Sequence, residues 1–321
     1  MNQAKELPKG TKIGKYRIEF LIGAGGFGHV YKVKDTSTNQ SLALKTEQKG
    51  LEHSFIKNEI ESLTNLKTPC FPIIRDKGEY KNLYFYVMNI YGLSISDIIK
   101  MNKLPLSTSL IICCQMFQVI ETLHSLGYIH RDIKPSNFLL QQSTKDPLVL
   151  VDFGLAILLI DPNTGKPKPL NEGRFVGTKK YASTFSHSGE ALGQRDDLIS
   201  WIYSCVEIID GSLPWASCET IEDLVQVKHD ITPKELCRNL PREFHKILTY
   251  LLETENDQRP PYKKIQRRLD DALEANNIDI EKFNWQQFYI SHADLEGKCA
   301  NAQKQRQSNH QQKEGKGCEI A

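Results

Sequence analysis

Several features that mark specialised classes of protein are missing from this chain of 321 residues. Its eight cysteines include no Cys-x-x-Cys pair, which argues against a zinc site or a disulfide framework and favours a reducing compartment. The formal net charge of +2 is too small to indicate nucleic acid as the main partner. No stretch approaches the roughly 20 apolar residues of a membrane-spanning helix. The polar start "MNQAKELPKG" lacks the apolar run of a secretory signal. We therefore expect a cytoplasmic protein, with the nucleus as an alternative.

The pattern of apolar residues divides the chain into a strand-rich part and a helical part. Four short runs, "YRIEFLIG", "GHVYKVKD", "SLALKT" and "LYFYVMN", are rich in β-branched and aromatic residues and are separated by turn residues. One amphipathic helix is predicted among them, in "HSFIKNEIESLTNL". After Gly92 the spacing becomes helical, and the segment "STSLIICCQMFQVIETLHSLG" has Ser107 placed as an N-cap and Gly127 just beyond its end. Further helices are predicted at 196–210, 219–228, 241–253 and 262–275, which gives an α+β chain.

The first candidate site is the glycine-rich stretch "IGAGGFGHV", with Gly23, Gly25 and Gly28 between two predicted strands. Glycine lets a backbone approach phosphate closely, although an ordinary turn is the alternative. A strand rather than a helix follows, which excludes the dinucleotide-binding arrangement and favours a phosphate-covering flap. Lys45 ends the next alternating strand, and Glu59 on the predicted helix could pair with it, with Glu61 as the alternative partner.

The strongest segment is "YIHRDIKPSNFLL", which fits a His-Arg-Asp catalytic loop followed by Asn five residues after the Asp. Asp132 is placed to accept the proton of a substrate hydroxyl, Lys134 to neutralise a transferred phosphoryl group and Asn137 to bind a metal ion. The buried run "LVLVDFG" then ends at Asp152, whose carboxylate is the ligand type that magnesium prefers. These motifs occur in one compatible order, which a set of unrelated turns would not produce.

In these motifs the chain resembles the eukaryotic protein kinases, and among them the casein kinase I group. "HRDIKPSNFLL" has Phe-Leu-Leu after the Asn, and "GTKKYAS" is similar to that group's Gly-Thr-Ala-Arg-Tyr-Ala-Ser. "QRDDLISW" resembles Arg-Arg-Asp-Asp-Leu-Glu-Ser-Leu, "GSLPW" matches a segment of the group, and "FNWQQF" resembles its terminal Phe-Asp-Trp. The resemblance covers about residues 12–288.

The resemblance implies a bilobal protein kinase fold, with a small antiparallel-sheet N-lobe that holds one helix and a larger, mostly helical C-lobe. The expected kinase domain is 12–290, with the N-lobe at about 12–88, the hinge at 89–92 and the C-lobe at 93–290. ATP and Mg²⁺ are the implied cofactors, with Mn²⁺ as the alternative metal, and proteins are the implied substrates. We expect a monomer. A pseudokinase scaffold and a tyrosine or dual-specificity kinase are the alternatives, against which the complete motif set, Lys134 and Thr178 argue.

Further site residues follow from the same resemblance. The phosphate-covering loop would be Gly23, Ala24, Gly25, Gly26, Phe27 and Gly28, and the adenine pocket would be Ile22, Val30, Ala43, Leu139 and Val151, with Met88 as gatekeeper and Asn89 to Tyr91 as hinge. Plain core packing is the alternative for the apolar members. Thr178 matches the threonine that hydrogen-bonds the catalytic Asp and Lys, and Asp197 matches the carboxylate that braces the catalytic loop.

The Ala-Pro-Glu tripeptide that most protein kinases carry is missing, and "ASTFSHSG" stands in its place. The casein kinase I group also lacks this tripeptide, so the resemblance accounts for the absence. The missing Glu would leave Arg259, in "DQRPPY", without its usual carboxylate partner. Because a buried guanidinium needs an acceptor, Glu190 is the candidate partner.

Substrate choice is predicted from basic residues that follow the Asp-Phe-Gly motif. Casein kinase I enzymes read acidic or phosphorylated residues upstream of the target through a basic pocket. Its activation-segment arginine becomes Lys180 here, beside Lys179, and Arg174 adds positive charge with Lys166 and Lys168. Lysine binds phosphate as a point charge, so an acidic or phospho-primed preference is expected. A solvated basic loop is the alternative.

The last stretch, 291–321, is rich in Gln, Asn and Lys and is predicted to be a disordered tail. Its final "CEIA" resembles a C-a-a-X prenylation box with Cys318 as the acceptor, and Ala in the last place points to farnesyl. Nearby basic residues would add an electrostatic membrane signal. Glu319 departs from the pattern, so an unmodified cysteine is the alternative to peripheral membrane anchoring.

Overall fold

The computed structural model describes residues 6–25, 28–101, 103–143, 145–160, 168, 175–289 and 297. The chain divides into two compact units. The first unit comprises Met1–Ile56, Ile73–Leu93 and Tyr289–Ala321, and the second comprises Lys57–Pro72 and Ser94–Phe288. Helix α1 (Phe55–Asn65) therefore begins in the first unit and continues in the second. The 291–321 tail and its Cys318 lie outside the described residues, apart from Gly297.

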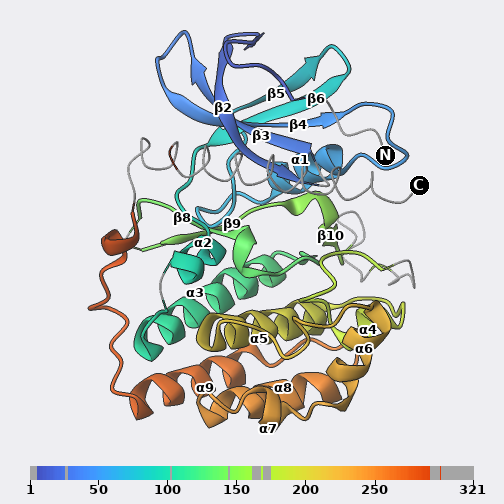
Figure 1. Cartoon of the computed structure of the whole chain (residues 1–321), viewed down its shortest axis with the longest axis vertical. Helices are drawn as coiled ribbons and strands as arrows, with labels where there is room; N and C mark the ends of the chain where they lie inside the picture. The colour runs from blue at the N-terminus through green and yellow to red at the C-terminus, as the bar shows by residue number, and fades with distance from the viewer. Residues whose placement is uncertain are drawn as a thin grey trace, which may run out of the picture. The chain divides into compact units, whose positions relative to one another are not determined.

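The first unit is built on one antiparallel sheet with the strand order β1-β2-β3-β4-β6-β5 (Figure 1). Its strands are β1 (Lys12–Ile13), β2 (Tyr16–Gly25), β3 (Gly28–Asp35), β4 (Ser41–Gln48), β5 (Asp76–Tyr80) and β6 (Leu83–Asn89). Alternate side chains such as Ile18, Val33 and Leu44 point into one apolar cluster, as the two-residue period of a strand requires. The four predicted strands are present. Strand β5, "DKGEY", was missed because it lacks the apolar residues by which strands are recognised.

The second unit is mostly helical. Its helices beyond α1 are α2 (Ile95–Met101), α3 (Leu106–Ser125), α4 (Thr184–His187), α5 (Gln194–Asp210), α6 (Ile221–Asp230), α7 (Pro233–Leu236), α8 (Arg242–Glu253) and α9 (Tyr262–Ala275). Helices α3 and α5 pack against each other, and α8 and α9 pack beside them (Figure 1). Trp201 on α5 lies at the centre of this packing, fully buried, and its indole N–H donates to the Cys113 carbonyl at 2.9 Å. The antiparallel-sheet and helical regions expected of the kinase fold are confirmed.

Short strands and turns in the second unit hold the predicted catalytic segments. Strand β8 (Phe138–Leu140) pairs with β9 (Leu148–Leu150), and β7 (Tyr128–Ile129) pairs with β10 (Ile157–Leu158), all antiparallel. Three-residue 3₁₀ turns lie at Pro135–Asn137 and Phe153–Leu155, and a four-residue 3₁₀ turn lies at Trp285–Phe288. The catalytic loop and the Asp-Phe-Gly motif are thus each placed between two short strands, which fixes both of their ends.

Helix α3 differs from the sequence prediction in two ways. It begins at Leu106 after Pro105, with no side-chain cap, so Ser107 lies inside the first turn and the N-cap prediction is wrong. Gly127 follows the helix with φ +83°, as predicted for its end. By length and hydropathy α3 is also apolar enough to cross a membrane, contrary to the expectation that no stretch approaches this. Two-thirds of that window (67%) is buried inside the fold, which is how a core helix of a helical unit looks.

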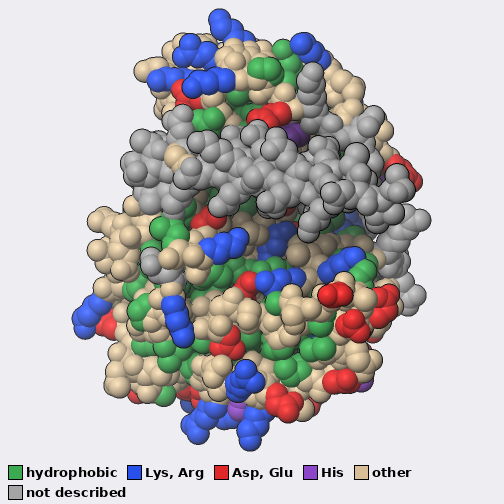
Figure 2. All heavy atoms as spheres, viewed as in Figure 1, with side chains coloured by type: hydrophobic (Ala, Val, Ile, Leu, Met, Phe, Trp, Pro, Cys, Tyr) green, Lys and Arg blue, Asp and Glu red, His purple; other side chains and the backbone are tan. Residues whose placement is uncertain are grey.

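Basic and acidic side chains both occur on the visible face of the helical unit (Figure 2). This mixture agrees with a net charge of only +2.

Candidate active site

The structure brings three predicted catalytic residues and one predicted metal ligand of the second unit into one hydrogen-bonded cluster. Lys134 Nζ donates to Asp132 Oδ2 at 2.6 Å and to Thr178 Oγ1 at 2.8 Å. Thr178 Oγ1 in turn donates to Asp132 Oδ1 at 2.7 Å. Asn137 Nδ2 donates to the Asp132 carbonyl at 2.9 Å. The carboxylate of Asp132 is therefore held by a cation and a hydroxyl, one on each oxygen, and its orientation is fixed.

The catalytic loop is braced from beneath by Asp197 on α5, as the resemblance implied. Asp197 Oδ2 accepts from the backbone N–H of His130 at 2.6 Å, and Oδ1 accepts from that of Arg131 at 2.8 Å. His124 Nε2 lies 3.0 Å from Oδ2. Burial by itself would raise the pKa of Asp197, but the hydrogen bond and charge of His124 outweigh it and lower the pKa. The ionised form is thus favoured, and it holds Arg131 in a left-handed conformation at φ +65°.

Gly177 is required where the chain approaches the catalytic loop. It has φ +91°, and a Cβ at this position would lie 2.5 Å from the Arg131 carbonyl oxygen. Only glycine accommodates both the conformation and the contact. This close approach places the next residue, Thr178, against Asp132.

The residues predicted to bind a metal ion have a donor set that suits Mg²⁺. Asn137 uses its amide N–H₂ on Asp132, which leaves the amide oxygen for a cation. Asp152 adds a carboxylate and has a left-handed backbone at φ +72°. Among the residues that the structure describes, no three His, Cys, Asp or Glu side chains form a metal site by themselves. A magnesium ion bound here would therefore take its other ligands from phosphate and water, as Mg²⁺ commonly does.

Helix α1 holds the Asp-Phe-Gly segment through two neighbouring residues. Glu59 is 1% exposed and accepts from the backbone N–H of Phe153 at 3.1 Å. Asn58 Nδ2 lies within hydrogen-bond distance of three carbonyls, those of Phe153 (3.3 Å), Gly154 (2.9 Å) and Ala156 (2.9 Å). The sequence prediction missed Asn58, because a single Asn on a helix gives no pattern. Lys45 lies in the first unit and Glu59 in the second, so their pairing stays a prediction.

The predicted nucleotide residues of the first unit lie on neighbouring strands. Val30 on β3 pairs with Lys45 on β4, and Ala43 on β4 pairs with the gatekeeper Met88 on β6. The other predicted residues lie in or just beyond β2 and β6, namely Ile22, Gly23, Ala24 and Gly25 in β2, Asn89 at the end of β6, and Tyr91 after it. Burial raises the pKa of Tyr91 to about 12. Gly26 and Phe27 lie outside the described residues.

Gly28 has a structural reason to be glycine that does not involve a ligand. Its φ is +111°, and a Cβ would lie 1.9 Å from the Thr46 carbonyl oxygen. Among the residues that the structure describes, no atom lies within 4 Å of the Cβ positions of Gly23 and Gly25. The predicted phosphate-covering role therefore depends on these two residues more than on Gly28. Of the second-unit pocket residues, Leu139 lies in β8 opposite Val149, and the N–H of Val151 donates to the Asn137 carbonyl at 2.9 Å.

The two described residues of the predicted anion pocket differ in their surroundings. Lys179 is exposed. Lys180 forms an ion pair with Glu207 of α5, and its side chain is 34% exposed. Arg174 and Lys166 lie outside the described residues. A substrate anion that binds Lys180 must therefore compete with the carboxylate of Glu207.

The prediction that a buried Arg259 pairs with Glu190 is wrong. Arg259 is exposed and lies over the Tyr262 ring, so its guanidinium needs no buried acceptor. Glu190 instead binds Arg195, whose Nη2 lies 3.3 Å from Glu190 Oε2. The Arg195 side chain is only 5% exposed. The sequence prediction transferred the family's arginine position, whereas the chain uses an arginine five residues beyond Glu190.

Arg195 anchors the segment that lacks the Ala-Pro-Glu tripeptide. Its guanidinium also donates to the Thr254 carbonyl and stacks on the Phe185 ring at 3.6 Å. Ser183 Oγ adds a second anchor, donating to Asp196 Oδ1 at 2.6 Å, and burial raises the pKa of Asp196. Two short contacts to the start of α5 thus replace the missing glutamate.

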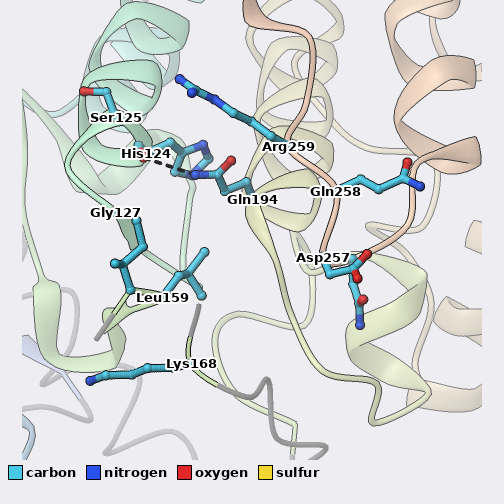
Figure 3. Close-up of a pocket in the computed structure, with 11 residues that line it drawn as sticks. His124, Ser125, Gly127, Leu159, Lys168, Gln194, Asp257, Gln258 and Arg259 are labelled. Atoms are coloured by element: carbon cyan, nitrogen blue, oxygen red, sulfur yellow. Dashed lines mark hydrogen bonds between the residues drawn. The ribbon is translucent and has the colours of Figure 1, made fainter. Parts of the chain in front are cut away.

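A cavity of ≈ 650 Å³ lies apart from the predicted catalytic residues (Figure 3). It is lined by the end of α3, the start of α5 and residues 256–259, with Arg259 and Lys168 at opposite ends of the labelled set. Gln194 donates to the His124 carbonyl at 3.1 Å within it. None of the predicted catalytic, nucleotide or metal residues lines this cavity.

Comparison with known proteins agrees with this geometry. The protein kinase domain family matches residues 16–268. A probable casein kinase I homolog of Encephalitozoon cuniculi is 31% identical over 289 residues, which cover 86% of this chain and 94% of the relative. A probable serine/threonine-protein kinase of Dictyostelium discoideum is 30% identical over 282 residues, 85% of this chain and 57% of the relative. Casein kinase I homolog 2 of Schizosaccharomyces pombe is 29% identical over 81% of this chain and 63% of the relative.

The chain thus spans less than two-thirds of the length of two of these relatives and nearly all of the third. The matched region contains the catalytic cluster, the Asp-Phe-Gly segment and the bracing Asp197. The chain belongs to the protein kinase family and, within it, to the casein kinase I group.

Proposed function

We propose that the chain transfers the γ-phosphoryl group of ATP to serine and threonine hydroxyls of proteins. The observation that carries this proposal is the hydrogen-bonded triangle of Asp132, Lys134 and Thr178. A carboxylate so fixed can orient a substrate hydroxyl and accept its proton. The neighbouring ammonium can neutralise charge on the phosphoryl group during transfer. Lys134 and Thr178 both favour serine/threonine over tyrosine specificity.

Mg²⁺ is the proposed metal, with Asn137 and Asp152 as its protein ligands and Mn²⁺ as the alternative. When bound, the metal would neutralise charge on the phosphates. The protein's own contribution is positional: Asn58 and Glu59 hold the backbone that carries Asp152, and the Asp132 carbonyl orients Asn137. Prealigned groups of this kind lower the barrier because they need no reorganisation during the reaction.

We also propose a preference for substrates with acidic or phosphorylated residues near the target hydroxyl. The support is the exposed Lys179, which lies next to Thr178 in the chain. Lys180 contributes less to this preference than its position implies, because Glu207 already binds it.

The proposal is tested by transfer of labelled phosphate from ATP to dephosphorylated casein, with the Asp152→Ala variant as the control. We expect label on casein from the wild-type chain and almost none from the variant. Label that does not depend on Asp152, or no label at all, would support the scaffold alternative. Phosphoamino-acid analysis of the product separates serine/threonine from tyrosine specificity.

A further inference from the structure

Lys180 already has a carboxylate partner supplied by the protein itself. Its Nζ binds Glu207 Oε1, and the Tyr181 hydroxyl donates to Glu207 Oε2. The Glu207 side chain is only 10% exposed and extends from α5, a helix whose residues are almost all buried. Both carboxylate oxygens are therefore used by two consecutive side chains of one segment. Burial, followed by the contact with Glu207, raises the pKa of Tyr181, so this hydroxyl keeps its proton and stays a donor.

The backbone of the same segment is held in place by two further residues. Trp215 Nε1 donates to the Lys180 carbonyl at 2.8 Å. Lys228 Nζ donates to the carbonyls of Lys179 and Ala182, both at 2.7 Å, and lies 3.2 Å from His187 Nε2. Two carbonyls and one imidazole nitrogen thus occupy the three hydrogen-bonding positions around this nitrogen. Lys228 is thus saturated and only 4% exposed, so it does not offer a second cation for a substrate anion.

The position of Lys180 matters for substrate recognition because Thr178, two residues earlier, contacts Asp132. A free cation so near the catalytic loop would attract an acidic or phosphorylated residue of a bound protein. A substrate anion must instead displace Glu207. Glu207 belongs to the same chain as Lys180 and therefore competes at a high effective concentration. A substrate anion loses translational freedom when it binds, which lowers its affinity.

We propose that Glu207 is a specificity-determining residue: its carboxylate occupies Lys180 in place of a substrate anion and suppresses recognition of acidic or phosphorylated residues there. This inference rests on the proposed function, since it concerns the substrates of that activity. It predicts that any preference for acidic residues arises from other cations such as the exposed Lys179, and that removing the negative charge at Glu207 makes Lys180 available.

The test compares wild-type chain with Glu207→Gln, which keeps the shape of the side chain and removes its charge. The probes are pairs of peptides with one target serine, identical except that one upstream residue is serine or phosphoserine, with that residue moved along the peptide. The readout is the ratio of kcat/KM for the phosphorylated and unphosphorylated members. At one position we expect Glu207→Gln to raise this ratio about tenfold, since a hydrogen bond to a charged group is worth on the order of one decade.

Two matched variants test whether the higher ratio of kcat/KM depends on Lys180. Adding Lys180→Met to Glu207→Gln should return the ratio to the wild-type value, because the gain passes through Lys180. Tyr181→Phe removes the other contact of Glu207 but leaves the ion pair, so its ratio should equal that of the wild type. A gain that survives in the double variant, or that also occurs in Tyr181→Phe, would overturn the proposal.

Lys180→Met in the otherwise unchanged chain tests the proposal even where Glu207→Gln folds poorly. The wild-type ratio should be unaffected by this change, and a fall of several-fold would show that Lys180 already reads a substrate anion. Binding of the same peptides, measured by fluorescence anisotropy without ATP, does not depend on phosphoryl transfer. A chain that transfers no phosphate but gains phosphopeptide affinity in Glu207→Gln contradicts the proposed function alone, and unchanged affinity contradicts the role of Glu207.

Discussion

Two lysine–carboxylate ion pairs of the helical unit contact the short segment 178–180. The first pair binds Thr178, and the second pair includes Lys180. In the catalytic pair, Lys134 binds Asp132, and both residues belong to a loop. In the anchoring pair, Lys180 binds Glu207, which belongs to the buried helix α5. The two pairs are made of the same charged groups but have different roles. The carboxylate in the loop is oriented by a cation and a hydroxyl, whereas the carboxylate on the core helix fixes the segment that it binds.

The largest expected effect breaks the catalytic pair. Asp132→Asn keeps the size of the side chain and removes its ability to accept a proton, so kcat should fall by about 10²–10⁴-fold. Stability should change little, because the amide can still meet Lys134 or Thr178 with one polar atom. The measurement is steady-state transfer to casein, with thermal unfolding recorded in parallel. Asp279→Asn, an exposed aspartate in neither pair, is the matched control. Activity within a few-fold of wild type in Asp132→Asn would refute the assignment of the catalytic pair.

The next effect concerns the arginine that replaces the missing glutamate contact. Arg195→Ala removes a buried guanidinium that binds Thr254, Glu190 and the Phe185 ring, and should lower the free energy of unfolding by about 2–3 kcal/mol. Arg259→Ala changes an exposed residue and should stay within about 0.5 kcal/mol of wild type. Chemical denaturation of both variants provides the comparison. The reverse order of stabilities would restore Arg259 as the anchor.

The two pairs also differ in how well the sequence predicts them. Asp132, Lys134 and Asn137 lie within six residues, and their chemistry fixes their spacing, so a local motif identifies them. The sheet and the long helices were likewise predictable, because apolar side chains repeat with the period of each element. Glu207 lies 27 residues from Lys180, and nothing in "SCVEIIDG" announces an ion pair. Its partner is set by the packing of α5, which is a property of the whole fold.

Arg195 and Arg259 also show that a local sequence pattern does not reveal which residue the fold buries. Both occur in recognisable stretches, "GQRDDL" and "DQRPPY", and the family pattern favoured the second. Burial decides which of them needs a carboxylate, and burial depends on how residues 254–261 pack against the start of α5. Asn58 was missed for a related reason, since its three acceptors are carbonyls that belong to a distant segment.

A smaller effect is expected on the catalytic side at Asn58. Asn58→Ala leaves three carbonyls of the Asp-Phe-Gly segment without their amide donor, and should lower the free energy of unfolding by about 1–2 kcal/mol. Amide hydrogen exchange at residues 153–157 should also become faster. Asn65→Ala, on the same helix, removes a more exposed amide and is the matched control. Equal exchange rates in the two variants would mean that Asn58 does not hold the segment.

The smallest effect is a pH dependence of the free energy of unfolding. It arises from Lys228, which holds the backbone of the segment that carries Lys180. Burial lowers the pKa of Lys228 to about 7, whereas an unfolded lysine titrates near 10.4. Between these values the unfolded chain binds a proton that the folded chain has lost, so the free energy of unfolding rises with pH. The neighbouring His187 adds little in this range: burial and the charge of Lys228 lower its pKa to about 4, so its contribution falls mainly between pH 4 and 6.5, which lies below that range. Wild-type stability should therefore gain about 1 kcal/mol between pH 7 and 8 relative to Lys228→Met.

Urea denaturation of both proteins at the two pH values measures this difference directly. Lys264→Met, an exposed lysine over the Tyr250 ring, keeps the wild-type slope and controls for the loss of a lysine. If wild type and Lys228→Met gain equally, Lys228 keeps its proton through this range. Its three acceptors and the rings of Tyr203 and Trp215 would then outweigh burial, and the segment that carries Lys180 would be tied to a permanent cation. The comparison therefore shows whether a charged or a neutral lysine holds the segment that carries Lys180 at neutral pH.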